Sequence, residues 1–69
     1  MIRKGEVVRI KFIKDYRICN TEYVPKDAEL YLFNFGYYTE IKNKDGYLVA
    51  RWKTGEDDWH YDFFKILDN

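Results

Sequence analysis

Hydrophobic and polar residues alternate with a period of two in several short segments of this chain. The clearest is residues 5–13, where Val8, Ile10 and Phe12 alternate with basic side chains. This alternation is typical of a strand with one buried and one wet face. The sequence therefore predicts a strand here with those three side chains in the core.

The middle of the chain predicts two further strands and a tight hairpin. Residues 29–35 alternate apolar and aromatic side chains, and Gly36 then lets the backbone turn or bulge. The segment Asn-Lys-Asp-Gly at 43–46 tolerates positive φ, which indicates a hairpin between residues 37–42 and 47–53. In the second of these strands we expect Leu48 and Ala50 to face the core.

Two segments lack this simple pattern. Residues 14–28 lose the alternation and contain the single proline, Pro25, which favours a long ordered loop or an irregular hairpin. After a turn at 54–56, the segment DDWHYD alternates again, so we interpret it as a strand with Asp58, His60 and Asp62 on its wet face and Trp59, Tyr61 and Phe63 opposite. A short turn at the Phe-Phe pair and a last strand complete the prediction.

Together these elements predict an all-β chain. We expect one domain over residues 1–69, a small five-stranded barrel with a long first loop and a short 3₁₀ turn before the last strand. Closure into a barrel would remove the exposed edges that an open sheet of this size presents.

The order of motifs resembles an SH3 domain. Tyr47 stands where the first tryptophan of that family often stands, and Asp15-Tyr16 resembles the end of its Ala-Leu-Tyr-Asp-Tyr motif. The other correspondences are an Ala-Arg pair at Ala50-Arg51, a glycine-containing distal turn at Thr54-Gly55-Glu56, and Phe63 or Phe64 near the tyrosine of the 3₁₀ turn. Bacterial SH3-like and Tudor-like barrels are similar to the same degree. The resemblance implies the fold, and a groove lined by Tyr16, Tyr47, Trp59 and Phe63.

Composition indicates how the core is built and in which cellular compartment we expect the protein. Aromatic residues make up 20% of the 69 residues, so large rings must supply much of a small core. The single cysteine, Cys19, has no internal disulfide partner, and the sequence contains neither a signal-peptide pattern nor a membrane-spanning apolar run. We therefore expect a cytoplasmic protein that does not enter a membrane. The composition, rich in Lys, Asn, Ile and Tyr, is compatible with a small bacterial or phage protein.

Charge is balanced overall but uneven along the chain. The net charge is zero, with 12 basic and 12 acidic residues. Residues 1–17 carry six basic against two acidic residues, a net of +4, and residues 54–69 carry one basic against five acidic, a net of −4. Opposite excesses at the two ends favour electrostatic pairing between them over a separate basic binding face.

The residue types argue against catalysis and metal binding. There is no serine, and nothing in the sequence links Cys19 to His60 as a thiol–imidazole pair. Asp58, His60 and Asp62 are chemically suitable metal ligands, but side chains two apart on a strand splay from one another. We therefore expect no enzyme activity, no cofactor and no metal.

The aromatic residues give the best functional indication. Seven Tyr, five Phe and two Trp exceed what so small a core can bury. The rings expected at the surface are Tyr16, Tyr23, Tyr37, Tyr38, Tyr47, Trp59 and Tyr61. Exposed rings suit recognition, because they offer large contact area with few torsions to freeze. The main hypothesis is a binding module for a protein or peptide, through Tyr16, Tyr47, Glu56, Asp57, Asp58, Trp59 and Phe63.

Three alternatives stay open at this point. The first is nucleic-acid binding, with tyrosines stacking on bases beside a basic face made of Arg3, Lys4, Arg9, Lys11, Lys14 and Arg17. The second is a small metal-binding protein or enzyme subunit. The third concerns assembly, since an aromatic surface also suits a homodimer.

Overall fold

The computed structural model describes residues 2–67 and consists of short strands with one 3₁₀ helix. The elements are β1 (Val7–Phe12), β2 (Tyr16–Arg17), β3 (Tyr23–Val24), β4 (Glu29–Asn34), β5 (Tyr38–Lys42), β6 (Leu48–Lys53), η1 (Asp58–Phe63) and β7 (Phe64–Ile66). The prediction of an all-β chain is confirmed, and the strands expected at 5–13, 29–35 and on both sides of 43–46 are all present.

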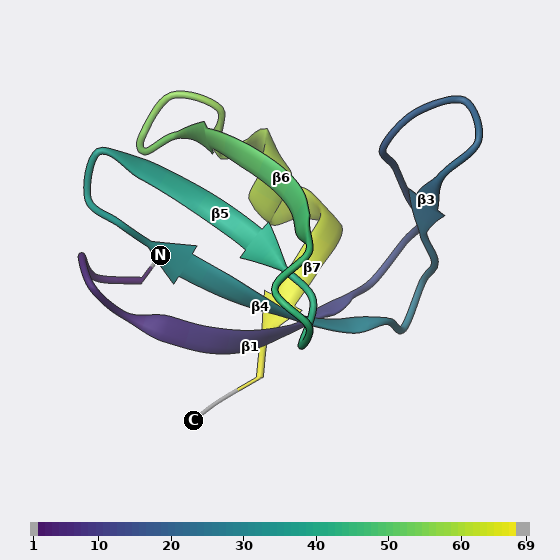
Figure 1. Cartoon of the computed structure of the whole chain (residues 1–69), viewed down its shortest axis with the longest axis horizontal. Helices are drawn as coiled ribbons and strands as arrows, with labels where there is room; N and C mark the ends of the chain where they lie inside the picture. Colours follow the sequence, from purple (N-terminus) through teal and green to yellow (C-terminus); the bar gives the residue numbers. More distant parts are fainter. Residues whose placement is uncertain (1, 68–69) are drawn as a thin grey trace.

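Five of the strands form one antiparallel sheet in the order β6-β5-β4-β1-β7 (Figure 1). The central strands β1 and β4 pair from Val7 opposite Phe33 to Lys11 opposite Glu29. β7, from the end of the described chain, lies beside β1, from its beginning. The two charge-rich ends of the sequence are thus neighbours in the sheet, although Lys11 lies opposite another cation, Lys65.

The long segment after β1 forms an irregular hairpin, as predicted. β2 and β3 pair in a two-stranded sheet that stands away from the main sheet (Figure 1). At its tip the Ile18 N–H donates to the carbonyl of Glu22 at 2.9 Å, and at its base the Asp15 carboxylate accepts from the Lys26 N–H at 2.8 Å. These bonds give an ordered loop, and they satisfy backbone groups that have no place in the main sheet.

The core lies on one face of the main sheet. Its buried side chains are Ile2, Ile10, Phe12, Val24, Leu32, Ile41, Trp52 and Phe64. Ile10 and Phe12 are fully buried, as the alternation in β1 predicts, and Val8 packs against the cluster. Phe12 contacts the ring of Phe64 with centroids 5.6 Å apart, which joins the first and last strands.

The predicted hairpin at residues 43–46 is confirmed. The Asn43 side-chain oxygen accepts from the N–H groups of Asp45 and Tyr47, each at 2.9 Å, and the Gly46 N–H donates to the Asn43 carbonyl at 3.0 Å. Gly46 has φ 87°, a left-handed conformation that glycine adopts without the steric cost of a Cβ. Asn43 and Gly46 together fix the turn between β5 and β6.

The prediction that Leu48 faces the core is wrong. Ala50 lies opposite Ile41, as expected for a core-facing pair, but Lys42 lies opposite Leu48, so the register shifts at this point. Val49 is the extra residue of a bulge, and the shift turns Leu48 to the surface, where 42% of it is exposed.

The strand predicted at DDWHYD is also wrong, because Asp58–Phe63 is the 3₁₀ helix η1. The predicted 3₁₀ turn before the last strand exists, but it begins at Asp58 and not at the Phe-Phe pair. The turn at 54–56 leads into this helix and does not join two strands. His60, expected on a wet face, is buried: its backbone N–H and its Nδ1–H donate to the Asp57 carbonyl at 3.3 and 2.7 Å.

No helix within residues 2–67 has the length and apolar character needed to cross a membrane.

Candidate functional site

Three of the predicted site residues come together where η1 meets the base of the hairpin. The ring of Tyr16 meets Phe63 edge-on at 5.3 Å between centroids, and Phe63 meets Trp59 at 5.9 Å. Tyr16 and Phe63 are half-buried, and Trp59 is exposed. We call these three residues the η1 cluster.

His60 packs beneath the η1 cluster between two indoles. Its ring stacks on Trp52 at 4.0 Å and on Trp59 at 3.8 Å. Trp52 is itself buried on β6, so this stack fastens η1 to the sheet. Sequence reasoning missed this role, because the polar imidazole was placed on a wet face.

Other parts of the protein cover much of the ring surface of the η1 cluster. The Lys14 ammonium lies 4.6 Å from the centroid of the Phe63 ring, a cation–π distance. Tyr16 is half-buried, and this burial raises the pKa of its hydroxyl above the ordinary value. The cluster therefore serves packing between the hairpin and η1 more than it offers an open site.

The predicted acidic residues Glu56, Asp57 and Asp58 lie between β6 and the start of η1. All three are exposed, and Glu56 lies 3.4 Å from the Lys53 ammonium. The pKa of the Tyr61 hydroxyl is raised, mainly because the phenol is partly buried and in addition because of the negative charge of Asp58. None of the three lines the groove to which Tyr47 belongs.

Tyr47, the remaining predicted residue, lies in a different place, on the wall of an apolar groove. The groove has a volume of about 440 Å³ and lies between the hairpin and the turn that joins β5 to β6. Its lining residues are Ile18, Thr21, Glu22, Tyr23, Val24, Pro25, Ala28, Leu30, Asn43, Tyr47 and Val49. We call this hollow the hairpin groove.

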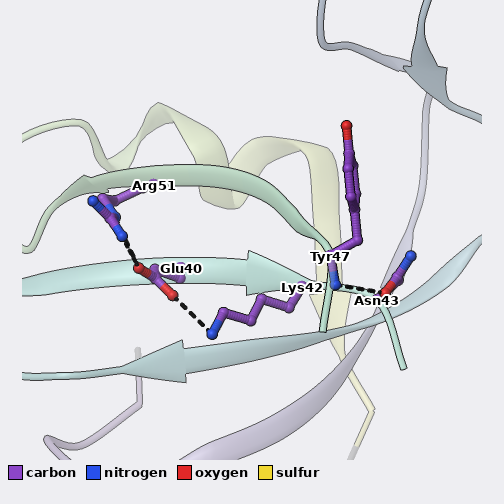
Figure 2. A network of polar contacts seen from close by, with 5 residues as sticks. All are labelled: Glu40, Lys42, Asn43, Tyr47 and Arg51. Carbon is purple, nitrogen blue, oxygen red and sulfur yellow. Dashed lines mark hydrogen bonds and ion pairs between the residues drawn. The ribbon is translucent and has the colours of Figure 1, made fainter. Parts of the chain in front are cut away.

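Two exposed tyrosines border the hairpin groove from different segments. Tyr23 comes from β3 and is 55% exposed, and Tyr47 comes from the turn and is 54% exposed. The Asn43 side chain holds the backbone of Tyr47, whose ring projects away from the turn (Figure 2). A mainly apolar hollow with two amphipathic rings at its border is typical of a binding site.

The sequence pointed to only part of this groove. Tyr23 and Tyr47 were expected at the surface, but Ile18, Glu22 and Val49 were not recognised as lining residues. The one available signal was Pro25 in an aromatic loop, which predicted order there without showing what the loop faces.

Of the other rings predicted at the surface, Tyr37 is 73% exposed, whereas Tyr38 and Tyr61 are half-buried. Phe35 is 46% exposed and was not predicted there. Aromatic exposure is thus spread over more than one face of the molecule.

The six basic residues proposed as a nucleic-acid face are spread over different segments, and three of them contact other groups of the protein. Arg9 lies 3.6 Å from Glu29 on the sheet, Lys14 covers Phe63, and the Arg17 guanidinium donates to the carbonyls of Cys19 and Asn20 in the hairpin tip. Lys11 lies on β1, and Arg3 and Lys4 precede it. Several of these cations therefore already have partners within the protein.

Within the part of the chain that the structure describes, no three His, Cys, Asp or Glu side chains gather as a metal site. Cys19 is exposed in the hairpin tip, where its Sγ lies 3.5 Å from the Thr21 hydroxyl. This contact, together with backbone hydrogen bonds, lowers the pKa of the Cys19 thiol below its ordinary value. His60 is enclosed by indoles and belongs to a different element.

Comparison with known proteins gave no relative: no family model, no curated protein and no solved structure matches this chain.

Proposed function

We propose that the main sheet curls into a small SH3-like barrel. Two observed features support this proposal: the long hairpin after β1 stands where SH3 domains have their long first loop, and the 3₁₀ helix η1 precedes the last strand, as their 3₁₀ turn does. Helix η1 also links the two outermost strands, because Trp52 of β6 meets Tyr61 at 6.0 Å and Tyr61 meets Phe64 of β7 at 5.3 Å. Nuclear Overhauser contacts from Tyr61 to both Trp52 and Phe64 test this closure, and their absence would contradict it.

We infer that the protein is a non-enzymatic binding module that holds an extended peptide segment in the hairpin groove. The observation that carries this inference is the coincidence of an apolar hollow with the exposed rings of Tyr23 and Tyr47. Such rings anchor partners well, since each buries a large area at low cost in side-chain entropy.

The lining chemistry defines the class of peptide. Glu22 is the charged side chain among the lining residues, so a basic residue in the peptide complements it. Tyrosine-bordered grooves accept proline-rich segments, whose extended backbone is already ordered before binding. We therefore propose a short, extended peptide with apolar or proline residues and at least one lysine or arginine.

Chemical-shift mapping tests this assignment. A basic proline-containing peptide is titrated into isotope-labelled protein, and shifts are expected at Ile18, Tyr23, Tyr47 and Val49. A matched peptide with glutamate in place of its basic residue is the control, and it should bind more weakly because of Glu22. Shifts confined to the η1 cluster, or no shifts at about millimolar peptide, the limit of weak binding, would contradict the assignment.

A further inference from the structure

The face of the sheet that points away from the core carries rings and cations across β4, β5 and β6. Phe33 lies opposite Glu40, Glu40 lies opposite Arg51, and Tyr38 lies opposite Lys53. Because paired positions and alternate residues of a strand share a face, these side chains stand on one surface. We call it the outer face.

The rings of the outer face form a partly exposed platform. Phe33 and Phe35 stack nearly parallel with centroids 5.9 Å apart, and Phe35 meets Tyr38 at 5.4 Å. At the edge of this platform Tyr37 is the most exposed of the large hydrophobic side chains. Phe35 is 46% and Tyr37 73% exposed, so part of each ring reaches solvent, although the Lys42 ammonium lies 5.8 Å from the Phe35 ring.

Each of these rings has a cation beside it. The Lys42 ammonium lies 5.3 Å from Phe33, the Arg51 guanidinium 4.9 Å from Tyr38, and the Lys53 ammonium 5.4 Å from Tyr37. Lys4 brings a fourth cation to this region without a ring contact of its own: its aliphatic chain lies against Gly36, where a Cβ would be only 2.9 Å from the Lys4 Cε. The flat ring surface is therefore bordered by positive groups.

The central carboxylate of this face is covered. Glu40 is only 3% exposed, and its Oε2 lies 2.7 Å from the Arg51 guanidinium while its Oε1 lies 3.4 Å from the Lys42 ammonium (Figure 2). Glu56 pairs with Lys53 at the edge. Four cations, Lys4, Lys42, Arg51 and Lys53, stand against these two carboxylates, which leaves a net charge of four minus two, or +2, in this group.

We propose that the outer face binds single-stranded nucleic acid, with bases stacking on Phe35 and Tyr37 and phosphates meeting Lys4 and Lys53. Single strands are bound in this way elsewhere, through exposed rings that accept any base and cations that follow the backbone. An acidic peptide would use the cations but leave the ring platform unused, so the combination favours nucleic acid.

This site is separate from the hairpin groove. None of Lys4, Phe35, Tyr37, Lys42, Arg51 and Lys53 lines the groove. The two sites can therefore be tested independently of each other.

The test is fluorescence anisotropy of a dye-labelled oligothymidylate of about 12 nucleotides with the full chain at low salt. Tyr37→Ala should weaken binding roughly 5- to 100-fold, the loss expected for one stacked base. Lys53→Gln should reduce the slope of log affinity against log salt by about 0.7, the value for one phosphate on a single strand. Tyr47→Ala, at a tyrosine of the hairpin groove that is 54% exposed, is the control and should leave the affinity for the oligonucleotide unchanged.

Three results would overturn the proposal. The first is no binding at about 50 mM salt, where phosphate contacts are strong. The second is full displacement by polyglutamate with no effect of Tyr37→Ala, which would assign the face to an acidic protein partner. The third is binding that survives both outer-face substitutions and is lost in Lys11→Gln or Lys14→Gln, which would move the site to the start of the chain.

Discussion

At the residue scale, three ionisable side chains have pKa values that depart from the ordinary ones, and the sequence alone does not show this. Cys19 is exposed and hydrogen-bonded, whereas the phenols of Tyr16 and Tyr61 are half-buried. The pKa of the thiol is lowered and those of the two phenols are raised. Each shift has a measurable consequence.

The thiol of Cys19 should react faster with iodoacetamide near neutral pH than an unperturbed cysteine, because its lowered pKa increases the thiolate fraction. Thr21→Val removes the largest cause, the hydroxyl contact, and should slow alkylation. Rates are measured by mass spectrometry across pH. Parent and variant should converge at high pH, where both thiols are ionised; a difference that persists there would show that Thr21 acts through access and not through the pKa.

Burial of the phenols predicts a loss of stability in alkali. The raised pKa values of Tyr16 and Tyr61 mean that the unfolded chain releases these protons first. Their contribution is therefore complete below a pH of about 10 and declines as the pH rises above that value. Urea midpoints at neutral and alkaline pH measure the decline, which Tyr16→Phe should reduce. Tyr37→Phe controls for the removal of a phenol at an exposed position, and an equal reduction there would contradict the explanation.

At the scale of elements, local patterns predicted the strands well. β1 and β4 were predicted because their alternation is uninterrupted, and the hairpin because Asn43 and Gly46 determine it within a few residues. The bulge at Val49 was not visible, since it depends on how β6 pairs with β5. Alternation in the sequence therefore gave the strands but not their register.

Helix η1 was missed because six residues of alternating polar and aromatic type also fit a short strand. What selects the helix is packing between elements: the His60 ring lies between Trp52, on the preceding strand β6, and Trp59 of η1 itself. The hairpin groove escaped prediction for the same reason, because its two walls come from segments far apart in the sequence. Only Tyr47 of the predicted site lies there.

The turn between β5 and β6 should be sensitive at Gly46. Gly46→Ala places a Cβ in a left-handed conformation but against no neighbouring atom, so strain alone should destabilise the protein by about 1–2 kcal/mol. Urea unfolding measures the change. Gly46→Asn is the control, because asparagine tolerates this conformation and should lose less. Equal losses in both variants would contradict a purely conformational cause.

Loss of one partner of the Arg51–Glu40 ion pair between β5 and β6 should lower the free energy of unfolding more than loss of both partners. Arg51→Met leaves the buried Glu40 with Lys42 as its remaining partner, and should destabilise by roughly 1–3 kcal/mol. The double substitution Glu40→Leu with Arg51→Met removes both charges and should recover most of that loss. Urea unfolding of the parent, Arg51→Met, Glu40→Leu and the double variant forms a double-mutant cycle. A double variant less stable than Arg51→Met would contradict the role assigned to the buried carboxylate.

At the scale of the whole molecule, the two surfaces that we propose as binding sites lie on separate parts of one small chain. The hairpin groove is apolar with tyrosines at its border, and the outer face combines rings with cations. Both surfaces are built from aromatic side chains that the small core cannot enclose. The zero net charge did not reveal the outer face, because a sum over the whole chain does not show that four cations gather there beside two carboxylates.

The central claim is that a peptide binds in the hairpin groove and not at the η1 cluster, and paired calorimetric titrations test it most directly. The basic proline-containing peptide is titrated into the parent, Tyr47→Ala and Trp59→Ala, two substitutions at tyrosine and tryptophan side chains that are about half exposed. Loss of a central anchor ring costs about 2 kcal/mol, or roughly 30-fold in affinity. We predict that loss for Tyr47→Ala and parental affinity for Trp59→Ala; the reverse order would contradict the assignment.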